Sequence, residues 1–257
     1  MRDNGRVSLY RDDGIVLRTQ KLGEADRIVT VLTRRNGRVR AVGKGVRRTK
    51  SRFGARLEPF THVDLLLYTG RSLDVITQAE TVRAYGEPLA TDYPRYTSGT
   101  AMLETAERFT PMEKEPLIRQ FLLLVGGLRA LGERVHDPRL VLDAYLLRTL
   151  AVAGYAPALD ECAVCGTPDG ARPGDMTGSR SFAVPAGGLT CRSCRPAGAA
   201  SPAVATVALM RALLRGDWDL ADASQARHQV ECSGLVAAYV QWHLEHSIRS
   251  LRHVEHV

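Results

Sequence analysis

Four cysteines stand in two pairs, Cys162-x-x-Cys165 and Cys191-x-x-Cys194, and a long spacer separates the pairs. Two residues between paired cysteines let both sulfurs reach one ion at about 2.3 Å, and two such pairs complete a tetrahedral shell. The spacer is longer than usual for such a site, but it is rich in Gly and Pro and loops out at small entropic cost. The spacing predicts a structural zinc site with no open position for catalysis.

Reduced free thiols and a thioredoxin-like redox pair are the alternatives for these cysteines, although a redox motif needs only one CxxC. The fifth cysteine, Cys232, has apolar neighbours at helical spacing and is expected to be a small buried residue. His243-x-x-His246 would share a helix face, but polar residues are common near helix ends, so metal binding there is disfavoured.

A second feature is a concentration of positive charge. The segment between Asp26 and Glu58 includes 11 Arg and Lys and no acidic residue, and it is called the basic window below. Because the whole chain carries +7, the remaining residues sum to −4. This pattern predicts a surface for a polyanion. The candidate ligands for its anionic groups are Arg34, Arg35, Arg38, Arg40, Lys44, Arg47, Arg48, Lys50, Arg52 and Arg56.

The basic window contains one aromatic residue, Phe53, so base stacking would contribute little there and phosphate neutralisation would dominate. A merely solvated face is disfavoured because so many like charges repel one another. Acidic lipid is disfavoured because no amphipathic membrane helix accompanies the window.

No common catalytic motif is present: GxGxxG, the Walker A loop, GxSxG and HExxH are all missing from the sequence. Asp12-Asp13 and Glu24 with Asp26 could hold a metal for nuclease chemistry, but turn capping is the favoured interpretation.

Short apolar runs in the N-terminal part of the chain predict five strands and a small closed or partly open barrel. Asn36-Gly37 predicts a type I′ hairpin turn. In the following strand, alternation places Val39 and Ala41 in the core and Arg38 and Arg40 together on the outer face. The glycines of the segment 43–57, with basic residues between them, predict a loop or a loosely held segment that could adapt to a ligand. The expected strands cover residues 14–19, 27–33, 38–42, 60–68 and 73–77.

Apolar residues at helical spacing follow the predicted barrel. Ser201-Pro202 is expected to open one helix as N-cap and first residue. The expected helices cover residues 96–109, 116–131, 138–153, 201–215 and 232–251. The expected division is a barrel domain (1–80), a first helical part (81–160), a zinc element (161–198) and C-terminal helices (199–257). The expected fold class is therefore α+β.

Hydrophobic residues make up 44% and charged residues 25%, both ordinary for a soluble globular protein. No apolar run reaches the roughly 20 residues that a membrane-spanning helix needs. The first residues lack an apolar signal core, so a cytoplasmic protein without a membrane partner is expected.

The motifs of the predicted barrel resemble those of the bacterial RecO family of recombination mediators. The similarity lies in Ser8-Leu-Tyr-Arg-Asp-Asp-Gly-Ile-Val-Leu-Arg-Thr, in Leu22-Gly-Glu-Ala-Asp-Arg-Ile-Val-Thr-Val-Leu-Thr and in Gly37-Arg-Val-Arg-Ala-Val-Gly-Lys-Gly-Val-Arg-Arg-Thr-Lys-Ser-Arg. The two CxxC pairs stand where many family members carry zinc. The resemblance covers essentially residues 8–250.

This resemblance implies an N-terminal OB-fold, a helical domain with a four-cysteine zinc element, and a non-enzymatic role. It implies binding of single- and double-stranded DNA, strand annealing, and loading of RecA together with RecR. The DNA would be coated by single-stranded-DNA-binding protein, whose C-terminal tail is a further expected partner. The expected location is the cytoplasm, at the nucleoid. A zinc-ribbon RNA-binding or transcription module and a Mg²⁺-dependent nuclease are the competing hypotheses.

Overall fold

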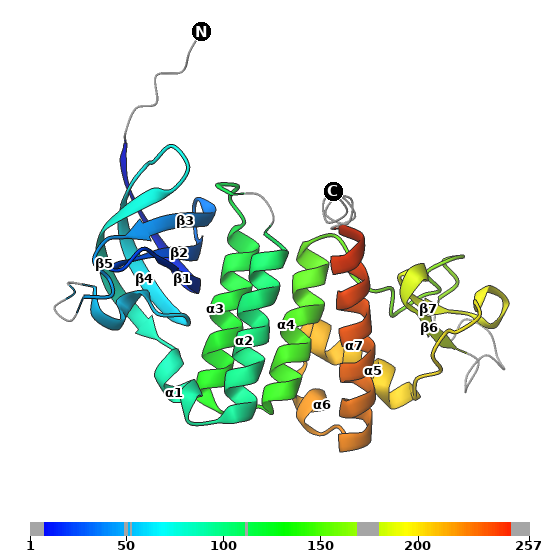
Figure 1. Cartoon of the computed structure of the whole chain (residues 1–257). Helices are drawn as coiled ribbons and strands as arrows, with labels where there is room; N and C mark the ends of the chain where they lie inside the picture. Colours follow the sequence, from blue (N-terminus) through cyan, green and yellow to red (C-terminus); the bar gives the residue numbers. More distant parts are fainter. Residues whose placement is uncertain (1–7, 49–50, 52, 111–112, 169–179, 248–257) are drawn as a thin grey trace, which may run out of the picture. The chain divides into compact units, whose positions relative to one another are not determined.

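The computed structural model describes residues 8–48, 51, 53–110, 113–168 and 180–247, and for residues 245–247 it describes the backbone alone. Its internal contacts divide the chain into two compact units, Met1–Val135 and His136–Val257. The first unit holds the barrel and three helices, and the second holds the other helices and a small sheet (Figure 1). The division at residues 80, 160 and 198 stays a prediction.

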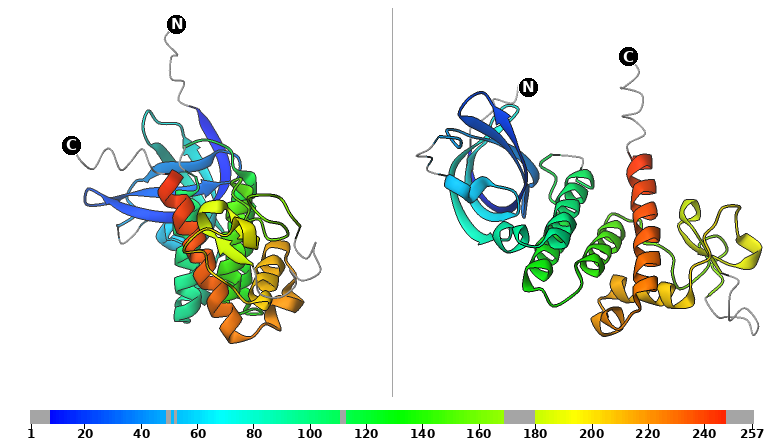
Figure 2. Two further views of the ribbon diagram at one scale, coloured as in Figure 1. Left: turned by 90° about the vertical axis from the view of Figure 1, so that its right-hand side faces the viewer. Right: turned by 60° about the horizontal axis from the view of Figure 1, so that its bottom comes forward.

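Five strands close into an OB-like barrel in the order β1-β2-β3-β5-β4, which Figure 2 (right) shows as a ring. Neighbouring strands are antiparallel except β3 and β5, whose parallel pairing covers only three residue pairs, from Ala41–Asp74 to Gly43–Ile76. A 3-10 helix, η1 (Gly54–Leu57), precedes β4. The strands are β1 (Leu9–Leu22), β2 (Asp26–Thr33), β3 (Gly37–Gly43), β4 (Thr61–Tyr68) and β5 (Asp74–Ala84).

The barrel interior is filled by the alternating apolar residues of its strands. In β3, Val39 and Ala41 are buried in this core while Arg38 and Arg40 point the other way, as their alternation predicts. The core continues with every second residue of β4, from Val63 to Leu67. The predicted barrel is thus confirmed.

The outer faces of β1 and β2 are buried as well. Ile15 and Leu32 are completely buried, although they alternate with the core residues Val16 and Val31. Two helices of the first unit, α2 (Tyr93–Arg108) and α3 (Ile118–Glu133), cover these faces. The near-continuous apolar runs of β1 and β2 follow from this burial on both sides.

The β2–β3 turn differs from the predicted type I′ turn. Thr33 pairs with Gly37, so the loop has three residues, and of these positions only Gly37 has a positive φ, of 62°. Such a loop is the three-residue hairpin that ends in a left-handed glycine. The turn is stabilised by the buried Asp12 carboxylate, which accepts hydrogen bonds from the backbone N–H groups of Arg35 and Asn36.

Each of the five predicted helices has a counterpart, and two further short helices, α1 (Gly86–Ala90) and α6 (Trp218–Asp222), were not predicted because each is too short for a periodic signal. The predicted Ser201 cap is wrong. Helix α5 (Val204–Arg215) starts later, and the Glu231 carboxylate accepts hydrogen bonds from the Ala203 N–H and the Thr206 hydroxyl. A carboxylate distant in sequence thus replaces the local cap.

In the second unit, α4 (Pro138–Val152), α5 and α7 (Ala226–Ser247) pack against one another. Cys232 is completely buried, as predicted. Beside it in sequence, the Ser233 hydroxyl donates a 2.6 Å hydrogen bond to the buried carboxylate of Asp143. Burial raises the pKa of Asp143 from 3.8 to about 7, against a smaller opposing effect of Ser233 and Arg139.

Gly37 is expected to tolerate no side chain. A Cβ there would overlap the carbonyl oxygen of Glu115, whereas at Gly23, with a similar φ of 58°, it would meet no atom within 4 Å. Gly37→Ala should therefore lower the free energy of unfolding by about 1–3 kcal/mol more than Gly23→Ala. Chemical denaturation of both variants measures the difference, and equal losses would contradict the close approach.

Asp143 is expected to make stability fall as pH rises. Because its pKa is higher in the folded state, its contribution to stability is complete below about pH 4 and is lost as pH rises through about 7. Asp143→Asn should therefore gain stability relative to the wild type over this range. Denaturation curves at pH 5 and pH 8 test this, and a difference independent of pH would refute it.

Candidate nucleic-acid interface and metal centre

The basic window is arranged along β3. The strand β3 spans about 20 Å at the usual rise per residue, with the β2–β3 turn at one end and residues 44–48 at the other. Arg34 and Arg35 lie in the first turn, and Lys44, Arg47 and Arg48 lie in the second. The window therefore presents two basic ends, called the turn end and the far end below, joined by β3.

At the turn end, both Arg34 and Arg35 are exposed. Their backbone is fixed, because the Arg34 N–H donates to the Asp13 carbonyl oxygen and the Arg35 N–H to Asp12. Asp12 thus caps the turn, the favoured interpretation for this carboxylate. The neighbouring Asp13 lies 3.1 Å from the His62 ring nitrogen Nε2.

At the far end, the described residues form turns and η1, which agrees with the expected loop, but the segment is not loosely held. The Gly45 N–H donates to the Asp26 carboxylate at 2.8 Å, and the Arg47 N–H donates to the Ala25 carbonyl oxygen. Val46 and Phe53 are buried in the barrel core. The segment is therefore attached to the barrel through both its backbone and its apolar side chains.

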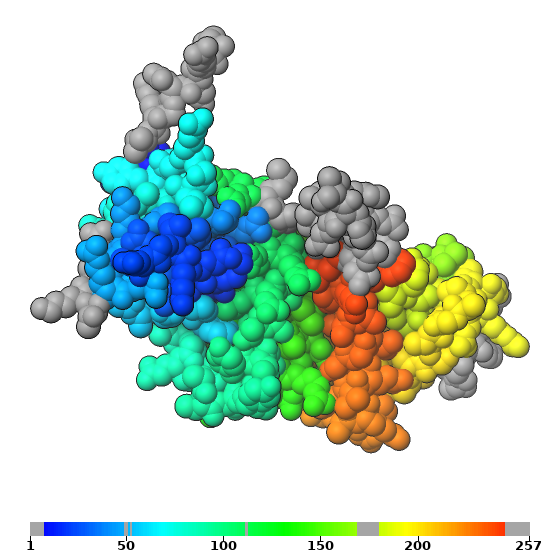
Figure 3. All heavy atoms as spheres, in the orientation of Figure 1, coloured from blue at the N-terminus to red at the C-terminus, as the bar shows by residue number. Residues whose placement is uncertain are grey.

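The side chains of this far end remain accessible. Lys44, Arg47 and Arg48 are exposed, and so is Arg56 on η1. Arg47 also donates to the Glu24 carbonyl oxygen at the β1–β2 turn, and Figure 3 shows the β1–β2 hairpin in dark blue at the surface of the first unit. Lys50 and Arg52, also predicted ligands, lie outside the described residues.

Between the two ends, the outer face of β3 is partly covered. The segment that joins α2 to α3, called the connector below, runs beside it: the Lys114 N–H donates to the Arg38 carbonyl oxygen. Arg38 Nη1 donates to the Glu107 carbonyl oxygen at 3.2 Å, and Arg40 Nη1 lies 3.6 Å from the Glu113 carboxylate. The DNA-binding role of Arg38 and Arg40 stays a prediction, but both guanidinium groups already have partners within the chain.

Sequence reasoning missed the acidic residues that face the window. Glu107 contacts Arg38 through its backbone carbonyl oxygen, while its carboxylate pairs with Arg18 at 2.7 Å. The Glu58 carboxylate pairs with Arg27, the one window cation that was not predicted as a ligand. Glu107 and Glu113 lie far from β3 along the chain, and nothing in their local sequence indicates that they return to it.

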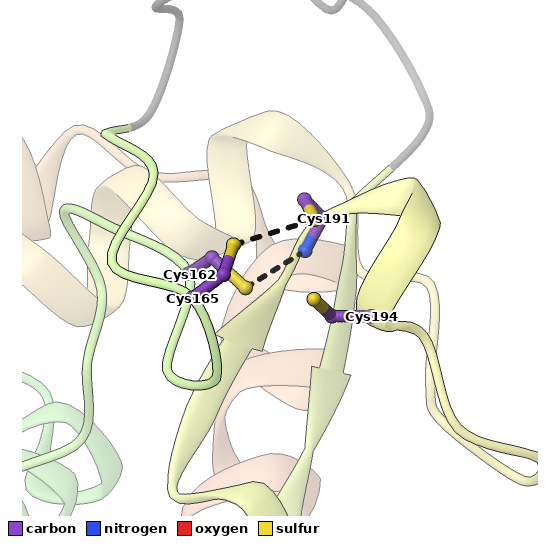
Figure 4. A group of neighbouring side chains, drawn as sticks. All are labelled: Cys162, Cys165, Cys191 and Cys194. Carbon is purple, nitrogen blue, oxygen red and sulfur yellow. Dashed lines mark hydrogen bonds between the residues drawn. The ribbon is translucent and has the colours of Figure 1, made fainter.

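The four predicted cysteine ligands lie together in the second unit (Figure 4). Their sulfur atoms all lie within 4.8 Å of one another, and the Sγ atoms of Cys165 and Cys191 are 3.9 Å apart. Four sulfurs around one ion at about 2.3 Å would be about 3.8 Å apart. Among the described residues, this is the one group of three or more metal-ligating side chains.

Two loops position these sulfurs. Cys162 and Cys165 lie on a tight turn in which the Gly166 N–H donates to the Cys162 carbonyl oxygen. The strands β6 (Ser181–Ala183) and β7 (Gly188–Thr190) pair with each other and are joined through the 3-10 helix η2 (Val184–Ala186). Cys191 directly follows β7, and Cys194 is the last residue of the 3-10 helix η3 (Arg192–Cys194). The Ala163 N–H donates to the Leu189 carbonyl oxygen and joins the first loop to β7.

The electrostatics suit a cation. Burial opposes ionisation of Cys162, but hydrogen bonds from the backbone of Cys191, Cys165 and Val164 outweigh it and lower the pKa of this thiol to about 6. The hydrogen bond with Thr167 lowers the pKa of Cys165. Hydrogen bonding with Cys191 and Cys165 raises the pKa of Cys194 to about 12. A thiophilic cation would displace the remaining thiol protons as it binds, so the donor set fits a tetrahedral metal ion.

The disfavoured histidine pair has an ordinary packing role in its described part. The His243 ring stacks on Tyr155, with centroids 4.6 Å apart, and meets Tyr239 edge-on at 4.5 Å. The side chain of His246 lies outside the described residues.

In the described part of the chain, no helix is long and apolar enough to cross a membrane.

Comparison with known proteins agrees with this arrangement. The family model described as Recombination protein O N terminal matches residues 7–85, and the one described as Recombination protein O C terminal matches residues 90–252. The DNA repair protein RecO of Thermobifida fusca is 70% identical over 97% of this chain and 99% of its own length. That of Streptomyces griseus is 58% identical over 97% of this chain and 100% of its own length.

The family models and the relatives assign this chain, with its OB-like barrel and its four clustered cysteines, to a class of DNA repair proteins. The chain belongs to the RecO family.

One thiophilic ion per chain is expected at the cysteine site. Titration with Co²⁺ should give the visible and charge-transfer absorption of a tetrahedral thiolate complex at a ratio of one ion per chain. Cys165→Ser should weaken binding strongly, because it removes one of four ligands. Cys232→Ser serves as the matched control and should leave ratio and spectrum unchanged, and equal behaviour of the two variants would contradict the assignment.

Proposed function

We propose that this protein is a recombination mediator that binds single- and double-stranded DNA and anneals complementary strands. With RecR, it helps to load RecA onto DNA coated by single-stranded-DNA-binding protein. The observation that carries this proposal is the pair of exposed basic ends of β3 on an OB-like barrel. Membership of the RecO family supports DNA as the polyanion.

Binding would occur mainly through phosphates. Six of the predicted ligands are described and exposed: Arg34, Arg35, Lys44, Arg47, Arg48 and Arg56. The single aromatic of the window, Phe53, is 1% exposed and has no face available for a base. Contacts to phosphates alone do not distinguish sequences, so binding should be largely independent of sequence.

The metal would be Zn²⁺ with a structural role. Four thiolates fill a tetrahedral shell and leave no position for a substrate or a reactive water. The ion would join the turn of Cys162 and Cys165 to the end of β7. In this proposal the protein acts through binding, without catalysis, in the cytoplasm at the nucleoid.

Partner binding would use surfaces beyond the window. The acidic C-terminal tail of single-stranded-DNA-binding protein needs an apolar pocket with a basic rim, and we place this pocket in the helical part of the chain. Such a division keeps the basic ends of β3 available for DNA while the coating protein is bound.

DNA affinity is expected to depend steeply on salt. If six phosphates are contacted, affinity should fall about a thousandfold between 50 and 200 mM salt. Arg34→Ala/Arg48→Ala removes one cation from each end and should reduce the slope of log affinity against log salt by about 1.8. Fluorescence anisotropy with a labelled duplex measures both values, and a flat salt response would refute the proposal.

The matched control is Arg108→Ala/Arg119→Ala, which removes the same charge from exposed positions of the helices in the first unit. It should leave the salt slope unchanged. Annealing of strands coated by single-stranded-DNA-binding protein should slow only with the first double variant. Tighter binding of RNA than of DNA of the same sequence would instead support an RNA-binding module.

A further inference from the structure

A strand of DNA that contacts both ends of β3 must pass along β3. The turn end and the far end are separated by about 20 Å, the length of β3. Between these ends, Arg38 and Arg40 are the cations on the outer face of β3. The groups that these two side chains contact therefore affect the binding of any DNA strand that follows β3 from one end to the other.

The two arginines differ in how firmly they are held. Arg38 lies under the connector: its Nη1 donates to a backbone carbonyl oxygen of α2, at Glu107, and its own carbonyl oxygen accepts from Lys114. Among the described residues, the partner of Arg40 is instead a side chain, the Glu113 carboxylate, at 3.6 Å, which is beyond ordinary hydrogen-bond length. The side chains of Arg40 and Glu113 are 37% and 34% exposed. Partly exposed ion pairs of this geometry are weak.

The connector backbone is attached independently of this ion pair. Lys114 Nζ lies 2.8 Å from the Asp74 carboxylate, which is 1% exposed and also accepts from the Tyr10 hydroxyl. On the other side, the carbonyl of Glu115 packs directly against Gly37. The Glu113 side chain can therefore leave Arg40 while the connector remains in place beside β3.

We propose that Glu113 occupies the position of a DNA phosphate on Arg40 and thereby lowers the DNA affinity of the barrel. A carboxylate and a phosphate oxygen make the same charge-assisted contact with a guanidinium group. Arg40 is thus a phosphate ligand held in reserve by an acidic group of the same chain, whereas Arg38 is a structural residue that joins β3 to α2. This inference rests on the proposed DNA binding of the window.

The experiment measures the affinity of the full chain for a labelled single strand over a range of salt concentrations, beginning at about 50 mM. Glu113→Gln keeps the size of the side chain and removes its charge. It should raise affinity three- to tenfold at the lowest salt and steepen the salt slope by about 0.7, the contribution of one more phosphate of a single strand. The double variant Glu113→Gln/Arg40→Ala should lose this gain.

Glu104→Gln is the matched control, because Glu104 is exposed on α2 and its substitution removes the same charge elsewhere in the first unit. It should change affinity less than twofold. Equal effects of Glu113→Gln and Glu104→Gln would overturn the inference, and so would a gain that persists without Arg40. If the inference about Glu113 fails but the wild type still binds DNA with a steep salt response, the proposed function remains intact. If the wild type does not bind DNA, both the inference and the proposed function are refuted.

Discussion

The architecture of the first unit depends on how β3 finds its hydrogen-bond partners. Only three of its residues pair with β5, from Ala41 onward, so most of the strand on that side lacks a barrel neighbour. The connector between α2 and α3 supplies one, through the Lys114 N–H and the Arg38 carbonyl oxygen. Gly37 permits this approach because it has no Cβ. The helices are thereby attached to the barrel at the strand that also carries the basic window.

This attachment explains the two-sided burial of the barrel wall. With α2 and α3 covering β1 and β2, Ile15 and Leu32 are buried on the outer side as Val16 and Val31 are on the inner side. The described exposed cations of the basic window lie in turns and in η1, whereas the two on β3 have partners.

Local patterns predicted the features that depend on local chemistry. The alternation of Val39 and Ala41 indicated the inward face of β3, and the CxxC spacings identified the four sulfurs that lie together. Long-range contacts were not predictable. The contact of Glu113 with Arg40 and the cap of α5 by Glu231 join residues far apart in sequence, and the three-residue loop before Gly37 depends on Asp12 from another strand. The charge of the basic window was evident from sequence, but its anchoring through Val46 and Phe53 required the fold.

The burial of Phe53 has a consequence for what a bound strand can do. A base stacked on an aromatic side chain has one face occupied and is oriented by the protein. The basic window offers no such face, since its only aromatic ring is inside the barrel. A strand held there through its phosphates keeps its Watson–Crick edges unoccupied by this surface. The packing of Phe53 in the core thus leaves the Watson–Crick edges of a bound strand free to pair with a complementary strand.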